Sequence, residues 1–341
     1  MRSNLIVIAA AVLGLSLAPS AHSAESIGIF ETVLESSVSF AETTAALESA
    51  IAESELQLHA THVVRVQDDV QQAKVYVLTS PTYAAAAASE SPRTVSAQVL
   101  RVAVYTMGDE KKAYVNMANP IAHAMVYYSE SSNYDALVSA ATAVAADIRG
   151  VVTAVPGNAV SRPLEPMRTE KKYRKFNGDG PAKMMAKFRN WDESQLLIDE
   201  APAGDFESTV DKVATMLAEG IVANAEECEG WEVITRIDLR DDAVYFGLSN
   251  PYIEDKMVRI NSRFRKDGKT DLAPYPGVDH MTALPTEVLV VNDGDKTKVL
   301  HYGQMWRMQL YFWDSGYRAF TANMGVPGTI VDSIEEAVRP D

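Results

Sequence analysis

Histidine and methionine are the residue types in this chain that could together perform chemistry. Beyond residue 23 the sequence contains five histidines, at His59, His62, His123, His280 and His301. Three of them have a methionine nearby: Met125 lies two positions after His123, Met281 directly follows His280, and Met305 lies four positions after His301. Imidazole and thioether ligands together suit copper, and histidine also ligates haem iron. These six residues are therefore candidate ligands, although no cofactor is identified, and the alternative is that they fill the core.

The common catalytic motifs are missing from the sequence. It contains no H-E-x-x-H, C-x-x-C, G-x-S-x-G, P-loop or G-x-G-x-x-G pattern. The run Gly247-Leu248-Ser249-Asn250-Pro251 begins like a nucleophile elbow, but Pro251 stands where the last glycine belongs. We therefore favour a non-enzymatic binding or interaction module, whose partner is an unknown small molecule or an envelope protein. A copper or haem handling protein and an enzyme with an unrecognised site stay open as alternatives.

The first 23 residues have the pattern of a secretory signal peptide. Arg2 precedes an apolar run from Leu5 to Leu17, and the small-residue pattern Ala21-His22-Ser23 follows. The apolar run is shorter than the roughly 20 residues that cross a bilayer, and no comparable run follows it. We expect a soluble mature protein without a transmembrane segment, located in the periplasm or secreted.

The chain is acidic except for one basic segment. Its formal net charge is -15, which argues against nucleic-acid binding because that requires a basic surface. Between residues 168 and 189, however, the sequence contains eight basic residues and only two acidic ones. We expect this segment either to lie as an electrostatic strap on the acidic domains or to dock an anionic ligand, lipid headgroup or partner. Its densest part, the basic patch, consists of Lys171, Lys172, Arg174 and Lys175.

Two similar stretches predict that the chain is duplicated. Leu100 to Pro120 and Arg307 to Pro327 each contain an apolar run, a polar turn, a second run and the ending Asn-Met-x-x-Pro, so both are expected to be hairpins. The gapless match pairs Asn116, Met117 and Pro120 with Asn323, Met324 and Pro327. Since proline lacks the N–H donor that continues a ladder, the motif is interpreted mainly as a strand terminator.

The surrounding patterns predict the same element order, β-α-β-β-β-β-α, in both repeats. Ser39 and Glu42 form a capping box before the first helix, and Asp205-Phe206 opens the corresponding helix of the second repeat. The expected divisions are a signal peptide at 1–23, a first α+β repeat at 24–150, a proline-rich and basic linker at 151–191 and a second repeat at 192–341. An insertion at about 257–305 is expected in the second repeat, with an extra hairpin and the candidate ligands from His280 to Met305.

Both repeats resemble the small α+β family catalogued as domain of unknown function 302. The resemblance is carried by Phe40-Ala41-Glu42-Thr43 and Phe206-Glu207-Ser208-Thr209, by the strand stop Ser249-Asn250-Pro251, and by Val115-Asn116-Met117-Ala118-Asn119-Pro120. It implies a curved antiparallel sheet with helices on one face, the TATA-binding-protein-like architecture. It implies no catalytic residues.

Overall fold

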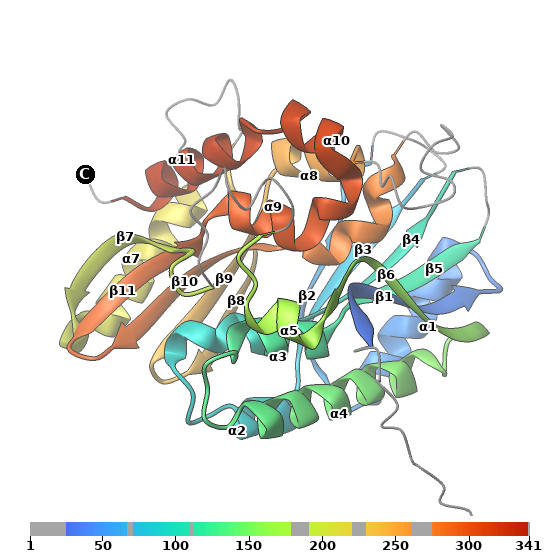
Figure 1. The fold of residues 1–341 in the computed structure, drawn as a ribbon, viewed down its shortest axis with the longest axis horizontal. Coiled ribbons are helices and arrows are strands. Elements are labelled where there is room, and N and C mark those ends of the chain that lie inside the picture. The colour runs from blue at the N-terminus through green and yellow to red at the C-terminus, as the bar shows by residue number, and fades with distance from the viewer. Residues whose placement is uncertain are drawn as a thin grey trace, which may run out of the picture.

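The computed structural model describes residues 25–66, 71–108, 112–178, 191–219, 230–260 and 275–339. The expected signal peptide lies outside these residues. The described chain forms two α+β halves that lie side by side (Figure 1).

The first half contains five strands of the expected repeat and the helices between them. In order, they are β1 (Ser26–Ser36), α1 (Phe40–Ala52), β2 (Gln57–Val63), β3 (Ala73–Thr79), α2 (Pro81–Ala86), η1 (Pro92–Gln98), β4 (Leu100–Thr106), β5 (Ala113–Ala118), α3 (Pro120–Tyr127) and α4 (Tyr134–Val152). Strand β6 (Gly157–Thr169) and helix α5 (Glu170–Arg174) follow.

The second half repeats this order. Its elements are β7 (Gln195–Pro202), η2 (Ala203–Asp205), α7 (Phe206–Glu219), β8 (Glu232–Arg240), β9 (Ala243–Ser249), α8 (Pro251–Val258), η4 (Pro276–Ala283), β10 (Thr286–Asp293), β11 (Lys296–Tyr302), α9 (Gln304–Phe312), η5 (Trp313–Ser315), α10 (Gly316–Ala322) and α11 (Val326–Val338).

The two sheets have the same strand order, which confirms the predicted α+β fold with two similar units. The first sheet runs β2-β3-β4-β5-β1-β6, and the second, read from its other edge, runs β8-β9-β10-β11-β7. Every pairing in them is antiparallel. Strand β6 is thus an addition at the edge of the first sheet.

The strand registers place individual residues of the halves in correspondence. The registers that define it are Leu78 with Leu100, Leu248 with Thr286, Val102 with Met117, and Val288 with His301. Counting along these strands makes Arg101 the counterpart of Glu287. Since β5 and β11 each lead into a helix two residues after Ala118 and Tyr302 respectively, α3 and α9 are also counterparts. His123 then corresponds to Arg307, and Tyr127 to Tyr311.

The predicted hairpin at Arg307 to Pro327 is wrong, because this stretch forms α9, η5, α10 and the start of α11. Trp306 and Leu310, four residues apart, are both fully buried, as expected on one side of a helix. The hairpin of the second half is instead β10–β11, inside the expected insertion at 257–305. That stretch therefore supplies two strands of the five-stranded sheet, and β10 lies between β9 and β11.

Asn116 and Asn323 consequently occupy unrelated positions. Asn116 lies in β5 and is completely buried, whereas Asn323 follows α10 and donates a hydrogen bond to the carbonyl oxygen of Ala319. The duplication is supported by strand order and register, and not by the motif from which it was inferred.

The expected linker at 151–191 also contains regular structure. Strand β6 pairs along most of its length with β1, so this stretch belongs to the first sheet. Arg168, at its end, is buried and donates hydrogen bonds to the carbonyl oxygens of Gln309 and Leu310 at the end of α9. The start of the basic segment is therefore anchored by a guanidinium that caps a helix of the second half.

Local signals at the helix starts are confirmed. Ser39 and Glu42 form the predicted capping box of α1. Phe40 is only half-buried, whereas Phe206 is buried at the start of α7. After the third strand of each half, Ser80 and Asn250 are the N-caps of α2 and α8, and each is followed by a proline.

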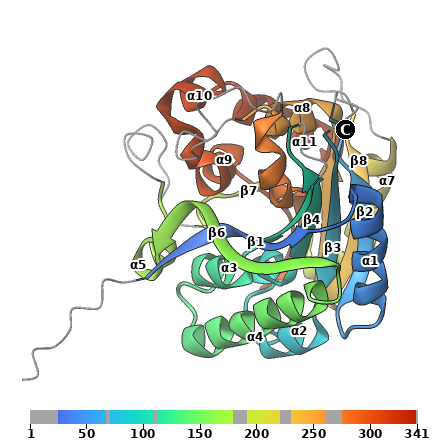
Figure 2. The same cartoon turned by 90° about the vertical axis from the view of Figure 1, so that its right-hand side faces the viewer.

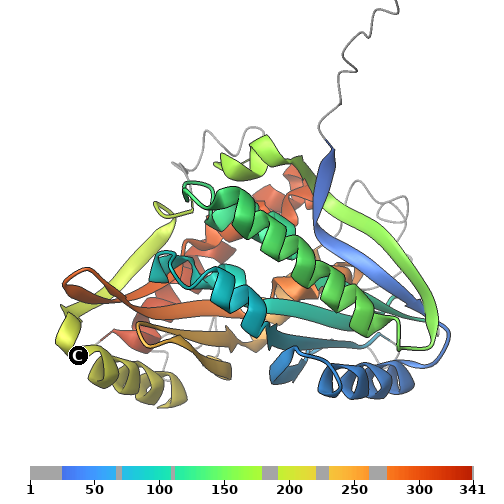
Figure 3. The same cartoon turned by 90° about the horizontal axis from the view of Figure 1, so that it is seen from below.

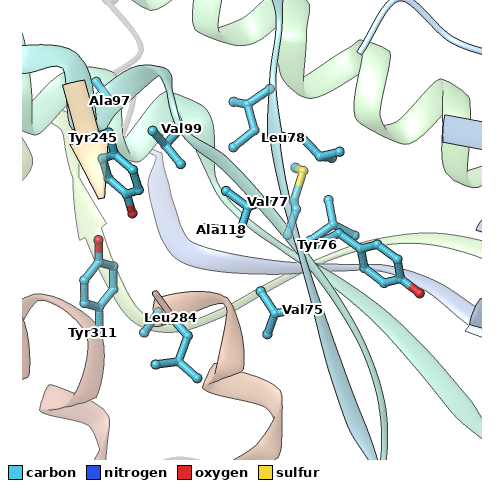
Figure 4. Close-up of a cluster of buried hydrophobic side chains, with 14 of the residues drawn as sticks. Val75, Tyr76, Val77, Leu78, Ala97, Val99, Ala118, Tyr245, Leu284 and Tyr311 are labelled. Atoms are coloured by element: carbon cyan, nitrogen blue, oxygen red, sulfur yellow. The ribbon is translucent and has the colours of Figure 1, made fainter. Parts of the chain in front are cut away.

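The halves are joined by an exchange of equivalent segments. The connection η1 of the first half packs on β9 and β10, while its counterpart η4 packs on β3, β4 and β5. Strands β2 and β8, also counterparts, lie next to each other where the two sheets meet. Figures 2 and 3 show the resulting arrangement, with α1 and α4 packed on the first sheet. Figure 4 shows a buried cluster that unites Val75 and Val77 of β3 with Leu284 of the second half.

Candidate functional site

A mostly apolar pocket opens in the second half between α8, α9 and the end of α10 with the start of α11. Its buried walls include Ile253 and Met257 of α8, Phe312 of α9 and Ile330 of α11. The side chains around it that retain partial exposure are Lys256, Ile260, Met308, Asn323 and Val326. Arg307 and Tyr311 also line it and are buried. The pocket therefore has an apolar interior, a partly exposed rim and a polar floor.

Lys256 is a cation of the rim that has no acidic partner within the described ranges. Its ammonium nitrogen lies 5.3 Å from the centre of the Tyr252 ring, and no carboxylate among the described residues forms an ion pair with it. Arg307, at the floor, is by contrast engaged by the buried carboxylate of Glu287. Among the described residues that line the pocket, the charge that no carboxylate engages is thus that of Lys256.

The pocket is small. Its volume is about 60 Å³, compared with roughly 150 Å³ for an apolar cavity that binds benzene. Only a molecule of a few non-hydrogen atoms fits without movement of the walls.

A buried polar cluster lies behind the pocket floor, where the two halves meet. Its second-half part is the ion pair of Glu287 in β10 with Arg307 in α9, and Arg307 also donates to the carbonyl oxygens of Ala283 and Pro285. Its first-half part is the counterpart pair Arg101 and His123, joined by a hydrogen bond of 2.7 Å from Arg101 Nη2 to His123 Nε2. The cluster thus brings together residues at equivalent positions of the two repeats, and the residue types at these positions differ in charge between the repeats.

Tyr311 joins the two parts of this cluster. Its hydroxyl oxygen lies 3.1 Å from Arg101 Nη2 and 2.9 Å from His123 Nε2. The guanidinium groups of Arg101 and Arg307 lie 5.6 and 5.2 Å from the centre of its ring. Tyr311 therefore contacts both cations and also forms part of the pocket floor.

His280 forms a second buried polar group, the Asp–His–Asp clamp with Asp279 and Asp314. Its Nδ1 lies 2.7 Å from Asp279 and its Nε2 lies 3.1 Å from Asp314. Burial alone would lower the pKa of His280, but the two carboxylates outweigh it and raise this pKa to about 9. The imidazole is therefore a cation that bridges two carboxylates, and both its nitrogens are occupied by protons.

The candidate metal ligands are not brought together as one site. His123 is bonded to Asn119, Arg101 and Tyr311, and Met281 and Met125 are buried, while Met305 is half-buried. His301 is fully buried, and neither of its ring nitrogens has a hydrogen-bond partner among the described residues. Glu335 lies 3.7 Å from its Nε2, and burial lowers the pKa of His301 to about 4. Within the described ranges there is no group of three or more His, Cys, Asp or Glu side chains arranged to hold a metal ion. A copper or haem site therefore gains no support from the described residues.

The remaining histidines have individual partners. His59 Nε2 lies 2.8 Å from the Thr79 hydroxyl, and His62 Nε2 lies 2.6 Å from Glu254, which is fully buried in α8. Burial raises the pKa of Glu254, but its hydrogen bonds to His62, Ser249 and Arg65 outweigh burial and keep the pKa low. The contact between His62 and Glu254 connects the edge strand β2 of the first half to α8 of the second half.

The basic patch is exposed on α5 and directly after it. Lys171, Lys172, Arg174 and Lys175 all face solvent, and none forms an ion pair with a described carboxylate. Arg174 instead stacks on Tyr134, with its guanidinium 4.0 Å from the ring centre. Lys183, Lys187 and Arg189 lie outside the described residues.

The motif residues have separate roles. Asn116 donates a hydrogen bond to the carbonyl oxygen of Asp279, across the boundary between the halves. Met117 is buried in β5, and Pro120 begins α3. Asn323 and Pro327 line the pocket, and Met324 is 42% exposed.

Sequence reasoning missed Arg101, Glu287 and Arg307. A signal was present, because the runs LRVAVYT and TEVLVV each carry one charged residue among mostly apolar ones. A charge buried in a strand requires a partner, and the counterpart positions would have pointed to a shared cluster.

The fold and site together define a duplicated α+β protein with a small pocket in one repeat and a polar cluster between the repeats. Among solved structures, the chain is similar to the uncharacterized conserved protein DUF302 from Bacillus stearothermophilus. The match has 16% identity and a TM-score of 0.31, and it covers 37% of this chain and 98% of the other. The name of that protein is that of the family which both repeats resemble in sequence. No family model and no curated protein matches the chain. No helix in the described ranges has the length and apolar character needed to cross a membrane.

Proposed function

We propose that the protein is a non-enzymatic binding protein whose second half holds a small carboxylate in the pocket beside Lys256. The observation that carries the proposal is a rim ammonium without a carboxylate partner among the described residues, placed at an apolar pocket. The ligand's carboxylate would lie at Lys256 and its short alkyl chain would lie along Met257, Phe312 and Ile330. With the signal peptide expected at 1–23, binding would take place in the periplasm or outside the cell.

The pocket volume selects the size of the ligand. At about 60 Å³ it suits a chain of two to four carbons, and a longer chain would have to displace the walls. Burial of each CH₂ group contributes about 0.8 kcal/mol, so affinity should rise with chain length until the pocket is full and then stop rising.

Isothermal titration calorimetry with sodium butyrate and butylammonium chloride tests the proposal. Butyrate should bind and butylammonium should not, because the rim charge is positive. Lys256→Gln should weaken butyrate binding about tenfold, since a charge-assisted contact is lost, and Lys256→Arg should restore it. Lys212→Gln is the matched control, because Lys212 is an exposed lysine of α7 that contacts Asp199 outside the pocket.

Val326→Trp supplies an independent test, because this half-buried rim residue would fill the pocket mouth. It should abolish butyrate binding while the protein remains folded. Equal binding of butyrate and butylammonium, or butyrate binding that survives Val326→Trp, would contradict the proposal.

A further inference from the structure

Arg101 is a buried cation that forms no ion pair with a carboxylate of the described residues; the carboxylate charge that acts on it is that of Glu287, which is paired with Arg307. The residue is 4% exposed, and its hydrogen bonds go to His123 and the Tyr311 hydroxyl. Its Nε has no hydrogen-bond partner in the part of the chain that the structure describes. In the second half, the counterpart position is occupied by the carboxylate of Glu287.

His123 does not balance this charge. Its Nδ1 lies 2.8 Å from the carbonyl oxygen of Asn119, which can only accept, so Nδ1 carries the proton and Nε2 accepts from Arg101. Burial and the neighbouring Arg101 lower the pKa of His123 to about 3, and the ring is neutral. Glu287 is engaged by Arg307, so the cluster holds two guanidinium groups and one carboxylate.

One tyrosine hydroxyl near Arg101 is also available. Tyr245 in β9 is buried, and its hydroxyl forms no hydrogen bond with a described residue. Burial raises the pKa of Tyr245, so its hydroxyl keeps its proton and can donate. Tyr245 is close enough to Arg101 and Tyr311 to interact with them electrostatically, and Figure 4 shows the hydroxyls of Tyr245 and Tyr311 pointing toward each other.

We propose that Arg101 and the hydroxyl group of Tyr245 bind one small monovalent anion, chloride, at the junction of the two halves. A single negative charge would balance Arg101 in the first half, as the carboxylate of Glu287 balances Arg307 in the second. A buried guanidinium without a counter-charge is strongly unfavourable, and N–H and O–H donors are the groups that stabilise a buried anion. The anion would thereby hold the repeats together, which goes beyond carboxylate binding in the pocket.

Another source of negative charge is the Asp–His–Asp clamp, which contains two carboxylates around one imidazolium. Phe30 separates it from the cluster, since the ring of Phe30 lies 5.1 Å from that of His280 and 5.7 Å from that of Tyr311. The experiment must therefore distinguish a bound anion from a second possibility, in which Asp279 and Asp314 balance the charge of Arg101 from the other side of the Phe30 ring.

Thermal and urea unfolding in sodium chloride and in sodium gluconate at equal ionic strength measures the effect of the anion. Above the dissociation constant, each tenfold increase in chloride should raise the folding equilibrium constant about tenfold, because chloride binds the folded state. Arg101→Met should remove the chloride dependence. Arg162→Met, which changes an exposed arginine paired with Glu35, should leave it intact. Val326→Trp should also leave it intact, which separates this site from the pocket.

A bromide-soaked crystal of the unaltered protein gives a test that does not depend on any variant folding. The expected result is an anomalous peak in contact with Arg101 and Tyr245. Absence of this peak, or equal stability in chloride and gluconate, would overturn the proposal and assign the balancing charge to Asp279 and Asp314.

Discussion

The Asp–His–Asp clamp predicts that stability falls on the alkaline side of neutrality. His280 is 2% exposed, and its pKa is raised to about 9 from an ordinary value of 6.5. A raised pKa means that the folded state binds the proton more tightly than the unfolded state does. The contribution of protonated His280 to the free energy of unfolding is therefore complete below about pH 6.5 and is lost as the pH rises through about 9.

The magnitude follows from the difference between the two pKa values. At about 1.4 kcal/mol for each pKa unit, His280 contributes about 3 kcal/mol at pH 6.5 that is absent above pH 9. His280→Gln provides the comparison, because glutamine can donate to Asp314 but does not titrate. The advantage of the unaltered protein over His280→Gln should thus shrink by about 3 kcal/mol between pH 6.5 and pH 9.5.

Urea unfolding of both proteins across this pH range measures the difference, and NMR titration of the His280 ring measures the pKa directly. A control at Lys212→Gln should show the same pH dependence as the unaltered protein. A constant difference between the unaltered protein and His280→Gln, or an NMR pKa below 6.5, would refute the assignment of His280 as a buried cation.

Three further predictions concern packing and charge. Glu287→Gln should destabilise the protein by about 3–5 kcal/mol, because it leaves the buried Arg307 without its carboxylate. In the control, Glu200→Gln at an exposed ion pair should cost under about 1 kcal/mol, and urea unfolding measures both. Gly277→Ala should cost about 1–3 kcal/mol, since the added methyl would collide with the carbonyl oxygen of Met257, while Gly328→Ala, in open space within α11, should be neutral or stabilising by thermal melt. Ser39→Ala should cost about 1 kcal/mol by removing the capping box of α1; an unchanged midpoint would show that the cap contributes nothing.

Local chemistry accounts for the part of the fold that could be predicted. Ser39 with Glu42 and Asn250 with Pro251 are signals contained within a few residues, and the structure has both as helix starts. The stretch from Arg307 to Pro327 misled because aromatic and apolar residues are frequent in strands as well as in buried helices, and a short run does not separate the two. The structure shows that β10, and not the stretch from Arg307 to Pro327, is the strand between β9 and β11, and this pairing is a property of the folded sheet.

The site was less accessible to sequence reasoning, for a physical reason. His123 and His280 were singled out for metal binding, but each uses one nitrogen on a near neighbour, Asn119 or Asp279, and the other on a residue more distant in sequence, Arg101 or Asp314. The meeting of Arg101 with Tyr311 depends on how the two repeats pack. Charged residues inside apolar strands show that such a cluster exists, but not which groups complete it.

The most direct test of the proposed function is a crystal structure of the full chain soaked in sodium butyrate. The account predicts butyrate in the pocket, with its carboxylate nearest the ammonium of Lys256 and its alkyl chain between Met257 and Ile330. An empty pocket at a butyrate concentration that saturates binding in solution, or butyrate bound elsewhere on the protein, would contradict it.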